Sequence, residues 1–381
     1  MSPSDSTAML SGGKLVARKR GSFNIVHIVE LDTITLVIRV PVTGWGGEMT
    51  PAVKDAMDSQ VATMRLVRNK TKIPVPEIYA YDTSAENKIG APYICMSFIP
   101  GKTVSEVWFE DPDSGTLTRE ELRLRILTSL AQTMAKFSGL TFDKIGSIRE
   151  DASGSTVIGP VLDYIQQKDE TYHVTASGPF DSTSAYLTAT YVEDSVDDEF
   201  GRGARMVLDV AMACLPMDGS PPGFVLCAPD FNSQNIMADD EGNITALIDW
   251  DFAQTMPRHL GYSRYPGWIT RDWDLLTYGW PVNSDVEDSP EALERYRAHD
   301  NTEMGKALNW EGDWKFTEKS HITEAIWIAA QNELPRLRIC NKIVQTVVAL
   351  YRLGRMRGDE DFDWDTFKAT LKRWLGVDEL D

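Results

Sequence analysis

Apolar and polar residues alternate along the N-terminal part of the chain with the period of β-strands. The alternation covers three runs, Lys14 to Arg18, Ile25 to Leu31 and Ile34 to Val40, and short polar turns separate them. Residues 52–69 then change to helical spacing, with apolar side chains at every third or fourth position, namely Val53, Met57, Val61 and Met64. These patterns predict a small antiparallel sheet with a helix packed against it.

The later part of the chain carries mostly helical periodicity. Residues Thr118 and Glu121 have the spacing of a capping box, and the apolar residues in 122–137 then follow the period of an amphipathic helix. Two further stretches, 319–332 and 338–354, continue this pattern. We therefore predict that the C-terminal part is mostly helical.

A boundary between the two parts is indicated near residue 97. The run Tyr93–Phe98 is typical of a buried strand, and the Pro-Gly pair that follows ends it. We expect an α+β fold with two lobes. The N-lobe, a sheet and a helix, would cover 1–97, and the C-lobe would cover 98–381.

One stretch interrupts the helical pattern of the second lobe. A turn cluster at 239–243 lies between two short apolar runs, which predicts a β-hairpin. Asp230 and Asn235 come just before this hairpin, and Asp249 follows it directly. We expect the hairpin to bring these three polar side chains to one end of a small sheet.

Composition and charge exclude several classes of protein. The chain has 381 residues, of which 42% are hydrophobic, so it can bury a sizeable core. Its formal net charge of -19 repels phosphate backbones and anionic lipid, so we expect no nucleic-acid partner and no membrane partner. No apolar run spans a bilayer and no leader pattern opens the chain, so we expect a cytoplasmic protein.

Two carboxylates and one amide oxygen are hard ligands that suit Mg²⁺. Magnesium in such a site shares its other positions with substrate phosphates, so the arrangement indicates phosphoryl transfer. An aspartate five residues before the asparagine, Asp230, can take or orient the proton of an incoming hydroxyl. The alternative is that Asp230 and Asn235 only form the loop and that Asp249 caps the strand.

In this ordered arrangement the sequence resembles the aminoglycoside phosphotransferase family, within the protein-kinase-like small-molecule kinases, and the fungal branch in particular. The resemblance runs over most of the chain. The segments that carry it, besides the Asp-Asn-Asp arrangement, are Gly21–Asn24, Ile38–Pro41, Thr71–Pro76, Asn87–Tyr93 and Ile248–Asp251.

The resemblance implies a role for each matching residue. Asp230 would be the catalytic aspartate, and Asn235 and Asp249 would bind Mg²⁺. ATP would lie in the cleft between the lobes, against the residues that match the family's nucleotide site: Gly21, Ser22, Arg39, Gln60, Ser97 and Phe98. The implied activity is transfer of a phosphoryl group to a hydroxyl of a small-molecule acceptor, with a secondary metabolite among the candidates.

Two positions depart from the family pattern. The helix glutamate that pairs with the strand cation is Gln60 here, so Arg39 would retain a hydrogen bond but lose a charge pair. The histidine two residues before the catalytic aspartate is Ala228, which predicts a less firmly held loop. Two alternatives therefore stay open, a pseudokinase and an enzyme of this fold that acts on a small organic molecule without ATP.

Four aromatic residues follow the predicted metal site in the region where the family builds its acceptor pocket: Tyr262, Tyr265, Trp268 and Trp273. Their rings could bind a flat metabolite or a quaternary ammonium group. They could equally belong to the hydrophobic core, and both interpretations are kept.

Overall fold

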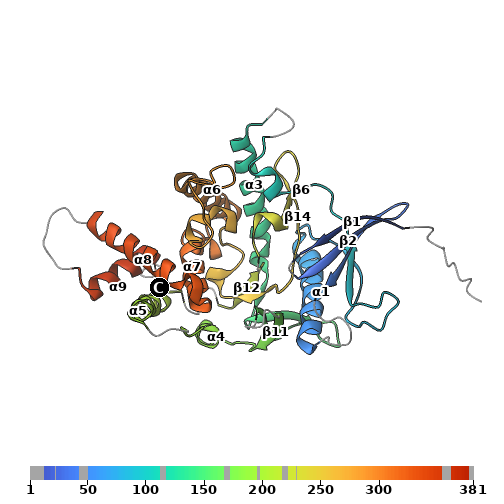
Figure 1. Cartoon of the computed structure of the whole chain (residues 1–381), viewed down its shortest axis with the longest axis horizontal. Helices are drawn as coiled ribbons and strands as arrows, with labels where there is room; N and C mark the ends of the chain where they lie inside the picture. Colours follow the sequence, from blue (N-terminus) through green and yellow to red (C-terminus); the bar gives the residue numbers. More distant parts are fainter. Residues whose placement is uncertain are drawn as a thin grey trace, which may run out of the picture.

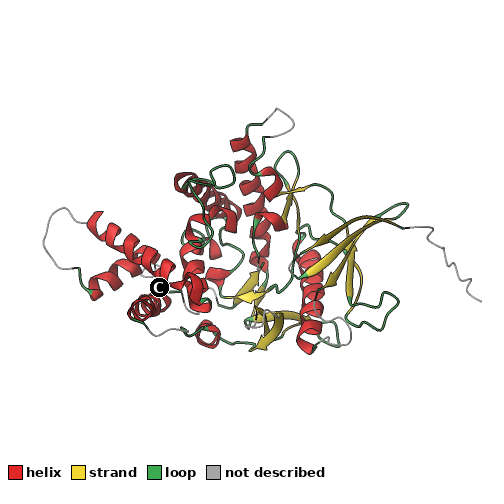
Figure 2. Ribbon diagram, viewed as in Figure 1, coloured by secondary structure: helices red, strands yellow, loops and turns green. Residues whose placement is uncertain are grey.

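A computed structural model of the chain describes residues 13–21, 23–42, 50–111, 117–166, 172–194, 198–216, 222–228, 230–353 and 362–376. Strands gather at one end of the molecule and helices at the other (Figures 1 and 2). Within the described ranges, no helix combines the length and the apolar character needed to cross a bilayer.

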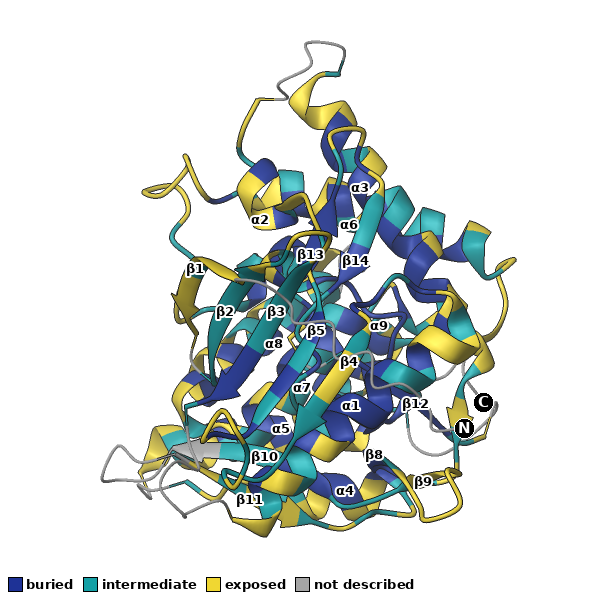
Figure 3. Ribbon diagram, turned by 90° about the vertical axis from the view of Figure 1, so that its right-hand side faces the viewer, coloured by how far each residue is buried: buried dark blue, intermediate teal, exposed yellow. Residues whose placement is uncertain are grey.

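The N-terminal region is an antiparallel sheet of five strands in the order β1-β2-β3-β5-β4. Its strands are β1 (Lys14–Arg20), β2 (Asn24–Glu30), β3 (Thr35–Pro41), β4 (Ile78–Asp82) and β5 (Tyr93–Ser97). Three of them follow the predicted alternating runs to within one or two residues. Strand β4 is partly exposed, whereas β3 and β5 are more deeply buried (Figure 3).

Helix α1 (Pro51–Thr71) packs against this sheet, as the apolar spacing predicts. It begins with Pro51 after the N-cap Thr50, whose side chain accepts a hydrogen bond from the Val53 amide. It ends at Lys72 in the left-handed conformation, with φ of 58°. Its buried stripe joins a core shared with the C-terminal region, through Val61, Met64 and Val67.

The C-terminal region is mostly helical. Its helices are α2 (Val104–Val107), α3 (Arg119–Met134), α4 (Thr183–Thr190), α5 (Glu199–Ala213), α6 (Pro290–Ala307), α7 (Ser320–Gln331), α8 (Glu333–Leu353) and α9 (Trp364–Leu375). The predicted capping box is confirmed at the start of α3, where Thr118 and Glu121 satisfy each other's backbone amides. A second core lies among α4, α5, α7, α8 and α9. The predicted α+β fold, a small antiparallel sheet followed by a larger helical region, is therefore confirmed.

Short strands thread through this helical region. They are β6 (Lys102–Thr103), β7 (Thr141–Phe142), β8 (Gly146–Glu150), β9 (Thr156–Ile158), β10 (Val161–Gln166), β11 (Tyr172–Ser177), β12 (Phe224–Cys227), β13 (Ile236–Ala238), β14 (Ile244–Leu247) and β15 (Gln254–Met256). The hairpin β10-β11 is a separate two-stranded sheet that lies below α1 in Figure 3. The predicted division at residue 97 coincides with the end of β5, and the lobe ranges themselves stay a prediction.

Candidate functional site

The hairpin predicted from the turn cluster is formed by β13 and β14. Its turn is closed by Asp239, whose Oδ1 accepts hydrogen bonds from the amides of Glu241 and Asn243 at 3.0 and 2.8 Å. Gly242 takes φ of +85°, and a Cβ there would lie 2.9 Å from a side-chain atom of Arg125 on α3. The turn therefore packs tightly on α3, which fixes the hairpin and the loop before it.

Three polar side chains meet at the open end of this hairpin. Asn235 ends the short 3₁₀ helix η2 (Ser233–Asn235), and its Nδ2 donates to the backbone oxygen of Asp230 at 3.0 Å and to its Oδ2 at 2.9 Å. The Ile248 amide donates to the Asn235 oxygen at 2.9 Å, which places Asp249 on the neighbouring strand end. Asp230, Asn235 and Asp249 are thus brought together, as the hairpin predicts.

Arg39 of β3 reaches this cluster from the N-terminal sheet. Its Nη2 lies 3.0 Å from Asp249 Oδ1 and 2.6 Å from Asp251 Oδ2. Asn24, at the start of β2, donates to the same Asp251 oxygen at 2.7 Å. Asp249 itself has φ of +61°, a conformation that non-glycine residues adopt at a cost. Ion pairs from Arg39 therefore link the N-terminal sheet directly to the segment that follows β14.

Burial and charge act on these groups in opposite directions. Burial alone would lower the pKa of Arg39, but the charges of Asp251 and Asp249 outweigh it and raise the pKa. Burial raises the pKa of Asp251, and the neighbouring charge of Asp249 adds to this effect. Asp249 goes the other way, because Arg39 more than offsets the effect of burial and lowers its pKa. Of the two carboxyl groups, Asp249 therefore loses its proton more readily than Asp251.

Gln60 does not pair with Arg39, so the hydrogen bond considered from the sequence is absent among the described residues. Gln60 lies on α1, is only 4% exposed, and its buried Nε2 has no hydrogen-bond partner there. The Arg39 guanidinium turns instead toward the two aspartates, whose charges attract it more strongly than a neutral amide can. Gln60 and Arg39 do line one small cavity together.

That cavity holds only about 40 Å³, which is space for roughly one water molecule. Three aromatic rings close it, with Phe23 centred 4.4 Å from Tyr164 and 5.7 Å from Phe252. Tyr164 belongs to β10, a strand that the sequence reasoning missed. In this conformation the space beside Arg39 is closed by side chains from the sheet, the β10-β11 hairpin and the segment after Asp249.

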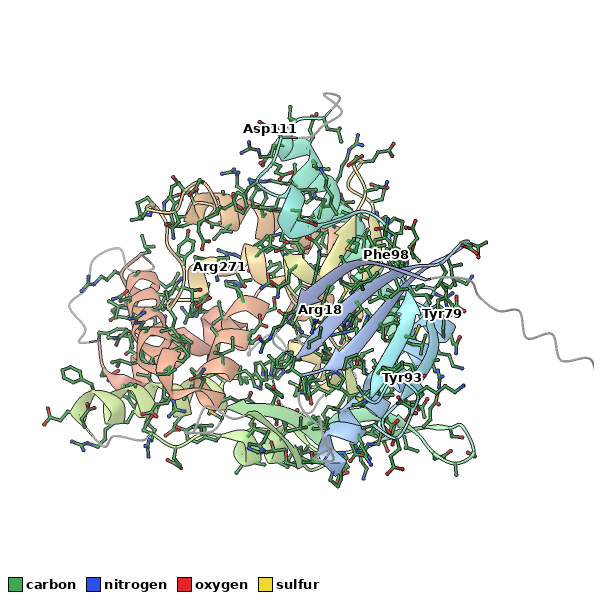
Figure 4. All side chains as sticks on the ribbon, turned by 45° about the vertical axis from the view of Figure 1, so that its right-hand side comes forward. Arg18, Tyr79, Tyr93, Phe98, Asp111 and Arg271 are labelled. Carbon is green, nitrogen blue, oxygen red and sulfur yellow. The ribbon has the colours of Figure 1, made fainter. Side chains whose placement is uncertain are left out.

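Of the other residues assigned to the nucleotide site, Ser97 ends β5, and Gly21 and Phe98 lie just outside strands of the sheet. Gly21 is exposed between β1 and β2, and its amide donates to the Asn24 oxygen at 2.8 Å, while Ser22 lies outside the described residues. The Ser97 hydroxyl accepts from the Glu77 amide at 2.9 Å. Phe98 is 37% exposed and lies where the chain leaves the sheet. Figure 4 shows it at a different place from Tyr79, which lies on the edge strand β4.

The four aromatic residues proposed for the acceptor pocket are all buried. Tyr262 and Tyr265 are each 2% exposed, Trp268 is 7% and Trp273 is 8%. Each packs into one of the two hydrophobic cores. Of the two interpretations kept above, the structure favours the core, because all four rings are buried; Trp268 and Trp273 lie on short 3₁₀ helices. An acceptor pocket built from their faces is not formed here.

Two residues near the cluster received no role from the sequence. Asp251 is the second partner of Arg39, and Arg264 lies behind the loop that carries Asp230. A signal for Asp251 was available, because it ends the segment Ile248–Asp251 that carries the family resemblance. No signal marked Arg264, which is 36 residues from Ala228 and 37 from Cys227 along the chain.

The donor atoms present fit a magnesium ion. The Asn235 Nδ2 donates to Asp230, and the Asn235 Oδ1 accepts no hydrogen bond from the described residues. The Asp249 side chain is 36% exposed, which leaves a carboxylate oxygen accessible. No group of three or more His, Cys, Asp or Glu side chains within the described ranges could hold a metal alone. A two-ligand site of this kind suits Mg²⁺ that keeps its waters or binds substrate phosphates.

Comparison with known proteins places the chain among phosphotransferases. The model of the phosphotransferase enzyme family matches residues 29–261, more than half of the chain. A subtelomeric hrmA-associated cluster protein of Aspergillus fumigatus is 34% identical over 151 residues, which cover 38% of this chain and 27% of that protein. A Candida tropicalis protein named "Altered inheritance of mitochondria protein 9, mitochondrial" is 31% identical over 139 residues, which cover 35% of this chain and 22% of that protein. The matched segments thus span about a quarter of these relatives.

Solved structures of low identity align over most of the chain. An apo thermostable mutant of aminoglycoside phosphotransferase APH(4)-Ia is 14% identical with a TM-score of 0.49, covering 88% of this chain and 94% of that one. A Plasmodium vivax ethanolamine kinase is 11% identical with a TM-score of 0.41, covering 99% and 85%. The family model, which spans β3, β4, β5 and the Asp-Asn-Asp hairpin, shows that the chain belongs to the phosphotransferase enzyme family.

Proposed function

We propose that the chain is an ATP- and Mg²⁺-dependent phosphotransferase that acts on a hydroxyl group of a small molecule. The observation that carries this proposal is the hydrogen-bonded arrangement of Asp230 and Asn235 with Asp249 on the adjacent strand end. Such an arrangement supplies one group for an acceptor hydroxyl and two oxygen ligands for a cation, which is what phosphoryl transfer requires.

Asp230 is positioned to receive the hydroxyl proton. The amide groups of Gln234 and Asn235 both donate to its Oδ2, each at 2.9 Å. These bonds fix the plane of the carboxylate and leave Oδ1 without a donor among the described residues. Asp230 is exposed, so an acceptor can approach that oxygen from solvent. In the proposed step the hydroxyl oxygen forms a bond to the γ-phosphorus, the bond to the β-phosphate oxygen breaks, and the hydroxyl proton passes to Oδ1.

Asn235 Oδ1 and the Asp249 carboxylate would hold the cation. Bound Mg²⁺ would neutralise phosphate charge during the transfer. Arg39 then has a second task, because a guanidinium can exchange carboxylate partners for phosphate oxygens. We propose that Arg39 leaves Asp249 when nucleotide enters and steadies its phosphates, which also opens the closed space beside it.

Calorimetric titration with Mg-ATP tests the proposal on the wild type, Asp249→Ala and the control Asp240→Ala. Asp240 is an exposed carboxylate on the turn of the same hairpin, so its removal makes the same charge change away from the site. We expect the wild type and Asp240→Ala to bind and Asp249→Ala to fail. Nucleotide at ~100 times its dissociation constant should also add ~2.7 kcal/mol of stability, visible as a thermal shift. Equal binding by all three proteins would contradict the assignment of Asp249.

A second candidate is a binding protein of the same fold that uses no ATP. The closed space of about 40 Å³ beside Arg39 favours it, since no nucleotide fits there without movement of Phe23 or Arg39. Absence of Mg-ATP binding by the wild type would support this candidate. If binding is found, a screen of hydroxylated small molecules, beginning with secondary metabolites, should identify the acceptor.

A further inference from the structure

Arg264 lies behind the loop that carries Asp230 and is buried, with 6% of the residue exposed. It follows the 3₁₀ helix η3 (Arg258–Leu260), and its Nη2 donates to the backbone oxygen of Ala228 at 2.7 Å. Its Nη1 donates to the sulfur of Cys227 and to the Leu260 oxygen. One guanidinium thus binds the two residues that lead from β12 into the loop.

The same guanidinium also touches the residue after Asp230. Its central carbon lies 5.5 Å from the centre of the Phe231 ring, in a cation-π contact. The Gly267 amide donates to the Phe231 oxygen at 2.8 Å, so the segment after Arg264 holds the loop as well. Contacts therefore fall on both sides of Asp230, at Ala228 and at Phe231.

Glu324 of α7 holds Arg264 from the other side, with its Oε1 3.2 Å from Arg264 Nε. Burial alone would lower the pKa of Arg264, but Cys227 and Glu324 outweigh it and keep the guanidinium charged. A buried charge with these partners has one stable position. Helix α7 is thereby connected through Arg264 to the backbone of the catalytic loop.

We propose that Arg264 is a positioning residue, which fixes the backbone on both sides of Asp230 so that its carboxylate meets the acceptor hydroxyl in line with the phosphate. This inference rests on the proposed function for its catalytic part and on the contacts above for its structural part. It also revises the expectation from Ala228. The loop is not left loose, because the Ala228 carbonyl is bound by an arginine from the segment after β15.

The chain offers a matched control in Arg336 of α8. Arg336 is 1% exposed, donates to the backbone oxygens of Ala329 and Ala330, pairs with Asp194 and lies 5.0 Å from the Tyr191 ring. It has the same kinds of partner as Arg264 but no contact with the loop of Asp230. Arg336→Met should therefore disturb packing to a similar degree without moving that loop.

Two measurements on full-length Arg264→Met, Arg336→Met and wild type test the proposal. The first is amide hydrogen exchange over 228–235, where Asn232 and Asn235 donate within the loop. The second is phosphate release from Mg-ATP with water as acceptor. We expect loop exchange to rise only in Arg264→Met, and its kcat to fall about 10- to 100-fold, because a displacement of about 1 Å can cost that much. The KM for Mg-ATP should stay within about twofold, since Arg264 touches no nucleotide-site residue.

Unchanged loop exchange or unchanged kcat in Arg264→Met would overturn the proposal, as would equal changes in Arg336→Met. If the wild type neither binds Mg-ATP nor releases phosphate, the proposed function fails, and loop exchange alone then decides whether Arg264 positions the loop. Should Arg264→Met not fold, Arg264→Lys takes its place under the same criteria. Lysine keeps the charge but cannot bind Ala228, Cys227 and Glu324 with one planar group.

Discussion

Two buried arginines lie on opposite sides of the Asp230 loop and bind different kinds of partner. Arg39 comes from the N-terminal sheet and binds the side-chain carboxylates of Asp249 and Asp251. Arg264 comes from the segment after β15 and binds a backbone oxygen, a thiol and the carboxylate of Glu324. The Asp249 side chain is 36% exposed, whereas the Glu324 side chain is 21% exposed and Cys227 belongs to a hydrophobic core.

This difference between the partners indicates which of the two arginines can give up its contacts to a ligand. A cation can take the place of Arg39 at Asp249, and phosphate oxygens can take the place of the carboxylates at Arg39. Each charged group then keeps a partner of opposite charge when a ligand binds, so the contacts of Arg39 can rearrange. Arg264 is held by Cys227, the Ala228 oxygen and Glu324 together, so a ligand would have to displace all three contacts to free it. We therefore expect the sheet side of the site to move during a reaction cycle and the α7 side to stay fixed.

The largest effect should come from the residue between the two arginines. Asp230→Asn removes the proton acceptor but touches neither Arg39 nor the predicted metal ligand Asp249. We expect turnover to fall by about 10²- to 10⁴-fold, with Mg-ATP affinity retained, as measured by phosphate release and calorimetry. Asp240→Asn on the same hairpin should behave as wild type. A parallel loss of nucleotide affinity in Asp230→Asn would show that Asp230 belongs to the binding site instead.

Unfolding in urea should separate the two arginines by stability. Arg264→Met removes the partner of Glu324 and the donors to Cys227 and Ala228 together, for which we expect a loss of about 3–5 kcal/mol. Arg39→Met should lose less, about 1–3 kcal/mol, because water can reach the freed carboxylate of Asp249 and Asn24 still donates to Asp251. The two variants make the same substitution, so each is the control for the other. A larger loss from Arg39→Met would mean that the bridge between the sheet and Asp249 is a fixed element of the fold.

Affinity for Mg-ATP should depend more on Arg39 than on Arg264, which is the reverse of the order expected for stability. Arg39→Ala removes a charged donor to the phosphates, and we expect Mg-ATP to bind about 10- to 100-fold more weakly. Arg39→Lys should recover part of this loss, since the charge is kept without the planar fork. Arg264→Met should bind Mg-ATP as the wild type does in the same calorimetric titration. Arg18 is an exposed arginine of β1, so Arg18→Ala is the control for the loss of one positive charge from the sheet. Unchanged binding by Arg39→Ala would contradict the proposed role.

Local patterns in the sequence predicted most of this framework. Alternation located β2 and β3, apolar spacing located α1, and the turn at 239–243 located the hairpin that carries the site. Each of these depends on neighbours within about ten residues, where backbone geometry and turn chemistry dominate. The hairpin β10-β11 was missed because its strands mix charged and apolar residues, as in Val161–Gln166.

The partners of the site's side chains could not be predicted in the same way. Arg39 and Asp249 are separated by 210 residues, and only the folded arrangement shows that Arg39 meets two carboxylates rather than Gln60. The rings of Tyr262 and Trp268 gave no periodic signal, because a turn and a short 3₁₀ helix carry them, and both interpretations stayed open until burial favoured the core. Contacts across the fold depend on packing that a single sequence does not display.

The smallest expected effect concerns the acid that holds Arg264. Burial raises the pKa of Glu324, and the charge of Arg264 opposes this only in part. A carboxyl with a raised pKa in the folded state contributes stability that is complete below its unfolded pKa and is lost as pH rises through the folded value. Glutamine does not titrate, so the free energy of unfolding of Glu324→Gln relative to wild type should increase as pH rises from acidic to neutral. Urea unfolding across this range measures the difference, with Glu318→Gln, an exposed glutamate just before α7, as control. A difference that stays constant with pH would mean that Arg264 holds Glu324 ionised throughout, and that the buried side of the site is as strongly charge-paired as the exposed side.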